Sequence, residues 1–381
     1  MTAARVAVLT PGGRGAIASL VVSGGVELID HHRLFEAANG RRLAEQDPGR
    51  ICYGFWGGDS NALPNEQVVV CRTGESRVEL HCHGGAAAVQ RILEDLVGSG
   101  AIRCDWADLA VAPSGSPASR IEVELAEALA AATTWQVAAI LLDQQAGVLV
   151  STLERLVATD WDQRHQAAAC VAGLLEWSDL GRRLVDPPTV VLSGGPNVGK
   201  SSLLNALLGF GRAIVLDEAG TTRDLVTAST ALQGWTVQFC DTAGIRSDAK
   251  GVEEAGISQA RQQLAEADCR LVVLDRSTSP HPQDLGLLEA WPDPLVIANK
   301  SDLDDAWGDE LPGSALSVSA LTGHGVEELV ERIVHRLVPE VPPPGTAVPV
   351  SAKLTEMLRK AARAIEENDE TSYREILRGC L

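Results

Sequence analysis

One short stretch constrains the fold of this chain more than any other: the glycine-rich run Gly194-Gly-Pro-Asn-Val-Gly-Lys-Ser201. It follows the apolar run Thr189–Ser193 and precedes the helix-forming run Ser202–Leu208. The pattern G-x-x-x-x-G-K-S between a strand and a helix is typical of a P-loop, because glycines let backbone N–H groups curl around a phosphate at a helix N-terminus. We therefore predict a nucleotide-binding α/β domain. In it, Lys200 is expected to reach the β and γ phosphate oxygens and Ser201 to bind Mg²⁺.

Two loops downstream of the P-loop carry groups that can sense a γ-phosphate. In Gly220-Thr-Thr-Arg-Asp224, Thr222 is the better placed threonine to contact both Mg²⁺ and the γ-phosphate. The run Val237–Cys240 predicts a strand that leads into Asp241, whose carboxylate is placed to hold Mg²⁺ through water. In the Thr-Ala-Gly that follows, the N–H of Gly244 is expected to face the γ-phosphate.

The identity of the base follows from a third strand end. Leu295–Ala298 predicts a buried strand, and Asn299-Lys-Ser-Asp302 follows it directly. A carboxylate at Asp302 can accept hydrogen bonds from N1–H and N2–H₂ of guanine together, which adenine cannot offer, and a buried unpaired carboxylate would reject adenine strongly. Ser319-Ala-Leu321, after another short strand, is expected to complete the base pocket through backbone N–H groups. The sequence therefore predicts a GTPase domain.

Charge and cysteine content limit the partners and the compartment. The chain has 32 Lys and Arg against 51 Asp and Glu, a formal net charge of −19. Bulk charge cannot hold a nucleic-acid backbone, so RNA binding would require a local basic patch or a basic partner. The eight cysteines form no C-x-x-C pair, which is typical of a reducing compartment. With no apolar run long enough to span a bilayer, we predict a cytoplasmic protein with no membrane partner.

Shifts in composition divide the chain into domains. Short β-like runs and one helical segment predict an α+β N-terminal domain over residues 1–113. Helical periodicity predicts an all-α domain in two pieces, residues 114–187 and 346–381. Strand and helix alternate over residues 188–338, which predicts a Ras-like P-loop GTPase domain (G domain) of the α/β class, inserted in the helical domain. The proline-rich segment 339–345 is expected to be a stiff linker.

The motifs also resemble a known family. The G domain is similar to the TrmE–Era branch of small GTPases, and the N-terminal domain looks like that of the tRNA-modification GTPase MnmE (TrmE) family. The residues that carry the resemblance are Gly194–Ser202, Gly220–Asp224, Asp241–Arg246, Thr10–Gly15, Val22–Gly24 and Val78–Gly85. The resemblance covers nearly the whole chain.

The resemblance implies a function and partners. Members of that family modify the wobble uridine of certain tRNAs with a flavoprotein partner, MnmG, and a folate one-carbon donor. They form homodimers through the N-terminal domain. Their GTPase is activated when two G domains meet, with K⁺ in the role that an arginine finger plays elsewhere. The resemblance therefore implies GTP or GDP, Mg²⁺, K⁺ and 5-formyl-tetrahydrofolate as ligands, and tRNA as the substrate.

Several positions depart from the family pattern. Of the residues that bind folate in the family, Glu79 is retained, but an arginine is replaced by Val21 and a lysine position matches Glu122, so we expect poor folate binding. The family's C-terminal Phe-Cys-Ile-Gly-Lys tail is not matched by Arg378-Gly-Cys-Leu381, where we expect Cys380 to be an exposed thiol. An alternative function therefore stays open: a GTP-switched regulatory or ribosome and RNA assembly GTPase that has lost the folate-dependent chemistry.

The mechanism of hydrolysis must differ from that of many small GTPases. The position that often holds a water-orienting glutamine is Ile245, which can neither donate nor accept a hydrogen bond. Asn197 is placed to bind a monovalent cation beside the phosphates. In the family, carbonyls that map to Leu216 and Glu218, next to Thr221, complete the K⁺ site, and a glutamate that maps to Glu253 positions the attacking water through a second one.

The predicted site residues fall into three groups. The catalytic group is Glu253, Lys200 and Thr222. Mg²⁺ is assigned to Ser201, Thr222 and Asp241, and K⁺ to Asn197, Leu216, Glu218 and Thr221. The residues predicted to bind GTP are Asn197, Val198, Gly199, Lys200, Ser201, Ser202, Leu216, Asp217, Glu218, Ala219, Gly220, Thr221, Thr222, Asp241, Thr242, Ala243, Gly244, Asn299, Lys300, Asp302, Ser319, Ala320 and Leu321.

Overall fold

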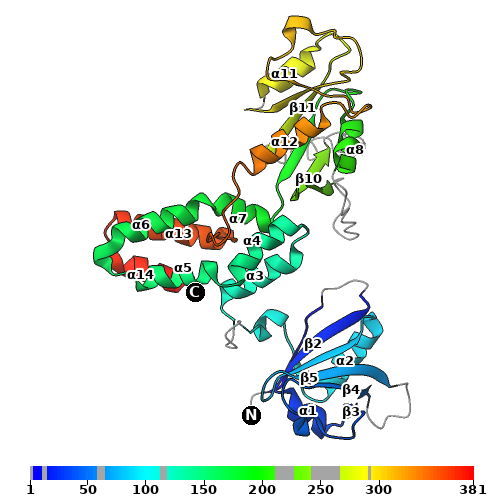
Figure 1. The fold of residues 1–381 in the computed structure, drawn as a ribbon, viewed down its shortest axis with the longest axis vertical. Helices are drawn as coiled ribbons and strands as arrows, with labels where there is room; N and C mark the ends of the chain where they lie inside the picture. Colours follow the sequence, from blue (N-terminus) through cyan, green and yellow to red (C-terminus); the bar gives the residue numbers. More distant parts are fainter. Residues whose placement is uncertain are drawn as a thin grey trace, which may run out of the picture. The chain divides into compact units, whose positions relative to one another are not determined.

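The computed structural model describes residues 3–10, 15–57, 65–111, 118–210, 227–241, 267–290 and 293–381. The chain divides into two compact units, Met1–Ser119 and Arg120–Leu381. Figure 1 shows a sheet with the helices α1 and α2 in the first unit, and a helical part joined to a second sheet in the second unit.

The first unit is built on a seven-stranded sheet in the order β3-β4-β5-β6-β2-β1-β7. Neighbouring strands are antiparallel except β1 and β7, which pair in parallel. The elements are β1 (Arg5–Val8), β2 (Ile17–Ser23), α1 (Gly25–His31), β3 (Phe35–Ala37), η1 (Leu43–Glu45), β4 (Ile51–Trp56), β5 (Glu66–Arg72), β6 (Val78–His83), α2 (Ala86–Gly98), β7 (Ile102–Arg103) and η2 (Trp106–Leu109).

One face of this sheet and the helix α2 enclose the core of the first unit. Strand residues of that face alternate with residues of the opposite face, and Leu20, Val70 and Leu80 are fully buried. The apolar stripe of α2 adds Ile92 and Leu96, in keeping with its helical spacing. This core contains only residues of the first unit.

The helical part of the second unit joins segments from both ends of the unit. Its elements are α3 (Arg120–Ala131), α4 (Trp135–Gln145), α5 (Val148–Ala158), η3 (Trp161–Gln163), α6 (Arg164–Glu176), α7 (Ser178–Val185), α13 (Ala352–Glu366) and α14 (Glu370–Arg378). The helix α13 packs against α6 and α7, and α14 packs against α5. The hydroxyl of Tyr373 on α14 donates to the carbonyl of Leu156 at 3.2 Å. The C-terminal helices thus complete the core that the earlier helices begin.

The segment after the proline-rich linker is fixed to α4. The side chain of Gln144, almost fully buried, donates to the carbonyl of Thr346 at 3.0 Å and accepts from the N–H of Val348 at 3.0 Å. On the other side, Gly181 of α7 lies against the same segment, because a Cβ added there would stand 1.8 Å from the carbonyl oxygen of Pro349. The chain can therefore pass between α4 and α7 only with a glycine at this position.

The stretch Trp135–Ala158 is long and apolar enough to cross a membrane by length and composition. In the structure it is divided at Gly147, which has a φ of 101° and precedes α5. Leu141, Leu149 and Leu153 from this stretch are fully buried in the core of the unit. Core helices of water-soluble proteins pass the same test, so the stretch is weak support for a membrane span.

The second sheet of the unit has six strands in the order β13-β12-β11-β8-β10-β9. Neighbouring strands are parallel except β9, which is antiparallel to β10. Its elements are β8 (Thr189–Ser193), α8 (Lys200–Phe210), β9 (Thr227–Leu232), β10 (Trp235–Asp241), β11 (Cys269–Asp275), α11 (Pro282–Ala290), β12 (Leu295–Asn299), η4 (Gly308–Glu310), β13 (Leu316–Ser317) and α12 (Val326–Leu337). The carboxyl ends of β8, β10, β11 and β12 therefore meet at one edge, where ligands of parallel α/β sheets bind.

A charged junction joins the sheet to the helices, in addition to the apolar core that they share. Asp268, just before β11, accepts from Arg182 of α7 at 2.8 Å and from the N–H of Thr189 at 3.0 Å. Arg183 also faces Asp268 and donates to the carbonyl of Leu337, the last residue of α12. The chain thus enters and leaves the sheet-containing part at neighbouring points.

The prediction that Cys380 is an exposed thiol is wrong. Its side chain is 8% exposed and lies in the helical core beyond the end of α14. Burial raises the pKa of the Cys380 thiol to about 11, which opposes the nucleophilic thiolate form. The structure therefore gives Cys380 a packing role.

Candidate nucleotide-binding site

The loop between β8 and α8 has the close approaches that require its glycines. A Cβ on Gly194 would stand 2.3 Å from the carbonyl oxygen of Val273 on β11. A Cβ on Gly199 would stand 2.3 Å from Nδ2 of Asn299, and Gly199 also has a φ of 94°. The loop is therefore pressed against the ends of β11 and β12, and only glycine fits at either position.

Lys200 and Ser201 begin the helix that follows the loop. The Nζ of Lys200 donates to the carbonyls of Gly194 at 3.0 Å and Gly195 at 2.7 Å, so the ammonium lies across the loop. Ser201 and Ser202 are exposed in the first turn of α8. Because helix N–H groups and an ammonium converge here, this end of α8 can hold a phosphate.

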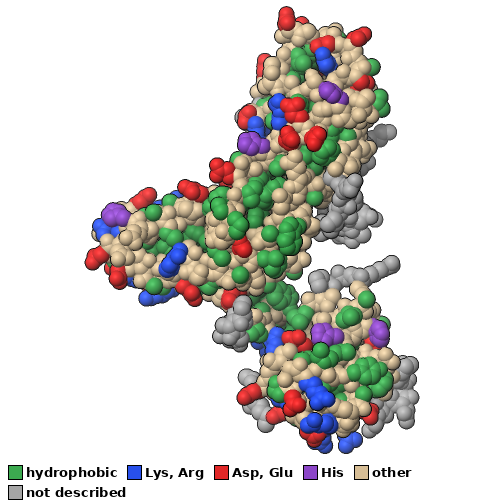
Figure 2. All heavy atoms as spheres, in the orientation of Figure 1, with side chains coloured by type: hydrophobic (Ala, Val, Ile, Leu, Met, Phe, Trp, Pro, Cys, Tyr) green, Lys and Arg blue, Asp and Glu red, His purple; other side chains and the backbone are tan. Residues whose placement is uncertain are grey.

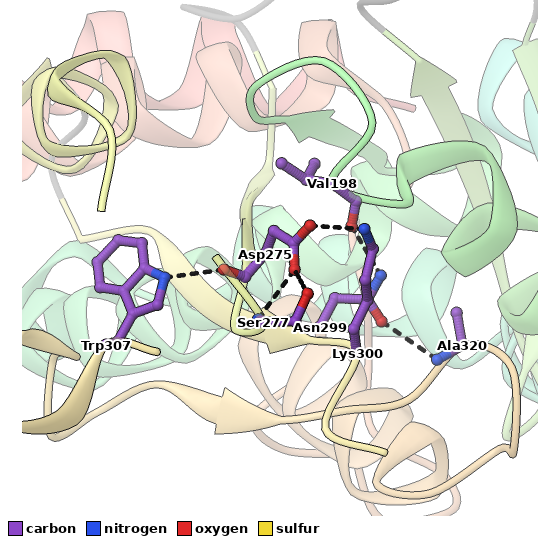
Figure 3. Close-up of polar contacts among 7 residues, drawn as sticks. All are labelled: Val198, Asp275, Ser277, Asn299, Lys300, Trp307 and Ala320. Atoms are coloured by element: carbon purple, nitrogen blue, oxygen red, sulfur yellow. Dashed lines mark hydrogen bonds and ion pairs between the residues drawn. The ribbon is translucent and has the colours of Figure 1, made fainter. Parts of the chain in front are cut away.

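Asn299 ties the P-loop to the opposite wall of the site. Its side chain is 1% exposed, and Nδ2 donates to the carbonyl of Val198 at 2.8 Å. Its Oδ1 accepts from the N–H of Ala320 at 3.1 Å. One amide side chain therefore fixes the distance between the phosphate loop and the segment 319–321 (Figure 3).

Asp302 is oriented by a buried hydroxyl. The Oγ of Ser319 donates to Oδ1 of Asp302 at 2.5 Å and accepts from the N–H of Thr322 at 3.1 Å. Ser319 is fully buried, whereas Asp302 and Leu321 are exposed at the rim. The carboxylate is thus held at the mouth of a pocket whose back is formed by Asn299 and Ser319, which suits an acceptor for two N–H groups of one base.

The structure places part of the predicted set and leaves part outside the described residues. Asn197, Val198, Gly199, Lys200, Ser201 and Ser202 lie in the loop and the first turn of α8, and Asn299, Lys300, Asp302, Ser319, Ala320 and Leu321 lie across the same sheet edge. Asp241 ends β10 opposite Leu192 of β8, so its backbone reaches this edge too. Outside the described residues lie Leu216, Asp217, Glu218, Ala219, Gly220, Thr221, Thr222, Thr242, Ala243, Gly244, Ile245 and Glu253.

Sequence reasoning missed Asp275, the last residue of β11. Its Oδ2 accepts from Nζ of Lys300 at 2.5 Å (Figure 3). The available signal was its position: it ends a buried strand at the same sheet edge as the other site residues. Its partner Lys300, however, follows a different strand, β12, and no spacing in the sequence predicts that the two residues pair.

In the first unit, one neighbour of Glu79 across the sheet is an aliphatic residue. Glu79 on β6 pairs directly with Val21 on β2. Val21, where the family has an arginine, is fully buried and packs with Ala7 and Leu109. A folate carries carboxylates that need a cation or N–H donors, and this position offers an aliphatic side chain covered by η2. Among the described residues beside Glu79, the side chain of Val21 therefore supplies neither a cation nor an N–H donor to a folate carboxylate.

Comparisons with known proteins agree with this geometry. A family model described as a 50S ribosome-binding GTPase matches residues 189–300. The tRNA modification GTPase MnmE of Bacillus licheniformis is 32% identical over 372 residues, which cover 86% of this chain and 81% of that protein. The protein of the same name from Thermus thermophilus is 32% identical over 400 residues, which cover 95% of this chain and 88% of that protein. Among solved structures, the G domain of the T. maritima FeoB iron transporter aligns with 40% of this chain and 99% of that chain, with 27% identity and a TM-score of 0.29.

A P-loop at the carboxyl edge of a parallel sheet, faced by Asn299 and Asp302, defines the class of P-loop GTPases. The relatives extend the match over most of the chain. The chain belongs to the tRNA modification GTPase MnmE family.

Proposed function

We propose that this protein binds GTP with Mg²⁺, hydrolyses it, and acts in the modification of tRNA wobble uridines. The observation that carries the GTP part is the pair of hydrogen bonds that the Asn299 side chain makes, one to the carbonyl of Val198 and one from the N–H of Ala320. It joins the phosphate loop to a base pocket whose acceptor, Asp302, is oriented by Ser319. A phosphate site and a guanine-type edge at a fixed separation suit a guanine nucleotide better than a free phosphate or an adenine nucleotide.

The oxygen donors that the sequence predicts suit the two cations. Mg²⁺ prefers hard oxygen ligands, which the hydroxyls of Ser201 and Thr222 and the carboxylate of Asp241 supply. We assign K⁺ to the amide oxygen of Asn197, which is exposed in the P-loop at a φ of 62°, together with Leu216, Glu218 and Thr221. When bound, these ions neutralise charge that develops on the phosphates. Lys200 binds the phosphate oxygens, and Glu253 is the residue that we assign to positioning the attacking water.

The cation dependence is directly testable. Because Ile245 cannot orient water, we expect slow GTP hydrolysis in NaCl and faster hydrolysis in KCl, with G-domain dimerisation as the step that K⁺ promotes. A charge supplied at the transition state is worth about 10³ in rate. Steady-state phosphate release in matched KCl and NaCl measures the effect. Asn197→Ala should lose most of the K⁺ stimulation and keep its affinity for GDP, since Lys200 and the loop amides remain. Equal wild-type rates in the two salts would contradict this part of the proposal.

The tRNA part of the proposal rests on the relatives. Their name says that they modify tRNA, and we extend this to a homodimeric, cytoplasmic protein that works with an MnmG-type flavoprotein. In the helical part of the view in Figure 2, Lys and Arg side chains are scattered among acidic ones. With a net charge of −19, contact with tRNA is better supplied by a basic partner than by this chain alone.

The packing of Val21 favours a second candidate, a GTP-switched regulatory or RNA assembly factor without folate chemistry. One experiment separates the two. Wobble uridines of total tRNA are analysed by mass spectrometry in a deletion strain and in the same strain carrying the gene again. Loss of a wobble modification that the gene restores supports the tRNA function. An unchanged nucleoside profile, in a genome with no second copy, contradicts it and leaves the regulatory function.

A further inference from the structure

The carboxylate of Asp275 lies in a cluster of polar contacts between protein residues, which nucleotide binding alone does not explain. Asp275 is 9% exposed at the end of β11. Its Oδ2 accepts from Nζ of Lys300 at 2.5 Å, and its Oδ1 accepts from Oγ of Ser277 at 2.6 Å and from the N–H of Ser277 at 3.0 Å (Figure 3). Both carboxylate oxygens are therefore used.

The backbone under this carboxylate is fixed as well. The indole Nε1 of Trp307 donates to the carbonyl of Asp275 at 2.8 Å. Trp307 is 3% exposed and packs in a small core with Val272, Leu274 and Val296, from β11 and β12. Burial raises the pKa of Asp275, but the hydrogen bonds from Lys300 and Ser277 outweigh it, so that the pKa lies below its ordinary value. A charged group is thus held at a fixed place beside Lys300.

Lys300 connects this cluster to the base pocket. Asp275 pairs with Asn299 in the parallel ladder between β11 and β12, so Lys300 is the residue just past its partner. Lys300 has a φ of 63°, a conformation that a lysine rarely adopts without support from its surroundings. The residue before it, Asn299, fixes the P-loop and Ala320, and Asp302 follows two residues later. An ammonium held at one place therefore fixes the direction of the whole turn 299–302.

We propose that Asp275 is a positioning residue for the guanine pocket, which holds the ammonium of Lys300 and thereby keeps the turn 299–302 in the conformation that binds a guanine nucleotide. The inference rests on the proposed GTP binding and adds a residue to it. Asp275 acts through Lys300, while Ser277 and Trp307 keep Asp275 in place.

The test compares two isosteric changes. Asp275→Asn removes the charge and keeps an oxygen for Ser277. The matched control is Asp305→Asn, which removes the charge of the neighbouring ion pair between Asp305 and Arg276, 3.1 Å apart, and contacts neither Lys300 nor Asn299. Asparagine keeps the Oδ1 that accepts from the N–H of Trp307 at 2.9 Å, so Trp307 stays in place. Binding of a fluorescent GDP analogue gives Kd and the dissociation rate, and thermal unfolding reports folding. We expect Asp275→Asn to raise Kd about tenfold, mainly through faster dissociation, and Asp305→Asn to stay within about twofold.

A double-mutant cycle distinguishes positioning from a merely structural ion pair. In a Lys300→Met background, Asp275→Asn should leave Kd unchanged from that of Lys300→Met alone. An undiminished effect in that background, or equal Kd values for Asp275→Asn and Asp305→Asn, would overturn the inference. If Asp275→Asn does not fold, Ser277→Ala replaces it: a rise in Kd of about two- to threefold supports the inference, and no rise overturns it. Wild-type protein that binds no GDP would instead refute the proposed function itself.

Discussion

At the scale of single residues, the base pocket depends on Ser319, which is fully buried and donates to Asp302. The hydroxyl fixes one carboxylate oxygen of Asp302, so the side chain is held in one rotamer and the other oxygen can face the base. The sequence predicted Asn299, Asp302 and Ser319 because each stands at a fixed offset from a buried strand. It could not predict the partner of Lys300, because Asp275 meets Lys300 only through the parallel pairing of β11 with β12.

The first residue-scale prediction concerns Asp302. Asp302→Asn removes the acceptor for two N–H groups of guanine, and we expect GDP binding to weaken by about 2–4 kcal/mol, because hydrogen bonds to a charged group are lost. Calorimetric titration measures the loss. Asp304→Asn, an exposed carboxylate two residues on, removes the same charge and should leave the affinity unchanged. Equal weakening in both variants would point to a general charge effect and against a role in base recognition.

At the scale of elements, the sequence predicted strands and helices well where the pattern was unbroken. Helical spacing alone favours one helix over residues 164–184, whereas the structure divides this stretch at Trp177 into α6 and α7. The strand signal of β4 is weak in the sequence, because Gly54 interrupts an otherwise β-like run. The structure explains this glycine by close approach: a Cβ on Gly54 would stand 2.2 Å from the carbonyl oxygen of Glu36. The close contact between β3 and β4 thus requires a glycine, and this glycine weakens the strand pattern in the sequence.

At this scale, alanine substitution at two glycines in neighbouring helices should change the free energy of unfolding in opposite directions. A Cβ on Gly181 in α7 would stand 1.8 Å from the Pro349 oxygen, whereas a Cβ on Gly173 in α6 meets nothing within 4 Å. Gly181→Ala should lower the free energy of unfolding by about 1–3 kcal/mol or more, because the segment 346–350 must move. Gly173→Ala should raise it by about 0.5–1 kcal/mol through helix propensity. Urea unfolding followed by circular dichroism measures both, and a neutral Gly181→Ala would contradict the packing described here.

At the scale of the whole molecule, the two units have separate cores. The sequence separated the G domain from the helices by composition. In the structure one continuous apolar cluster crosses this predicted boundary, and it includes Val137 of α4, Trp235 of β10 and Leu337 of α12. Composition could not predict this shared core. Each of the contacting side chains belongs to a helix or strand whose own pattern does not show which other element it packs against.

These cores predict two unfolding events. Residues 1–119 and residues 120–381 should unfold in separate calorimetric transitions. GDP at about 100 times its Kd should stabilise only the transition of the second unit, by about 2.7 kcal/mol. Differential scanning calorimetry with and without GDP gives both results, and limited proteolysis assigns each transition to its unit. A GDP-induced shift of both transitions would show that the units unfold together.

The junction at Asp268 also has a mechanical consequence. The chain enters the G domain beside Arg183 and leaves it at Leu337, and Arg183 bonds to the Leu337 carbonyl. A load on the nucleotide edge therefore reaches the helices through these two adjacent segments of the chain, as well as through the apolar core that the sheet and the helices share. Two adjacent connecting segments together resist stretching, but they allow rotation about the axis that they share. The junction thus transmits tension better than torque, and the contacts of Arg182 and Arg183 with Asp268 oppose the rotation that remains.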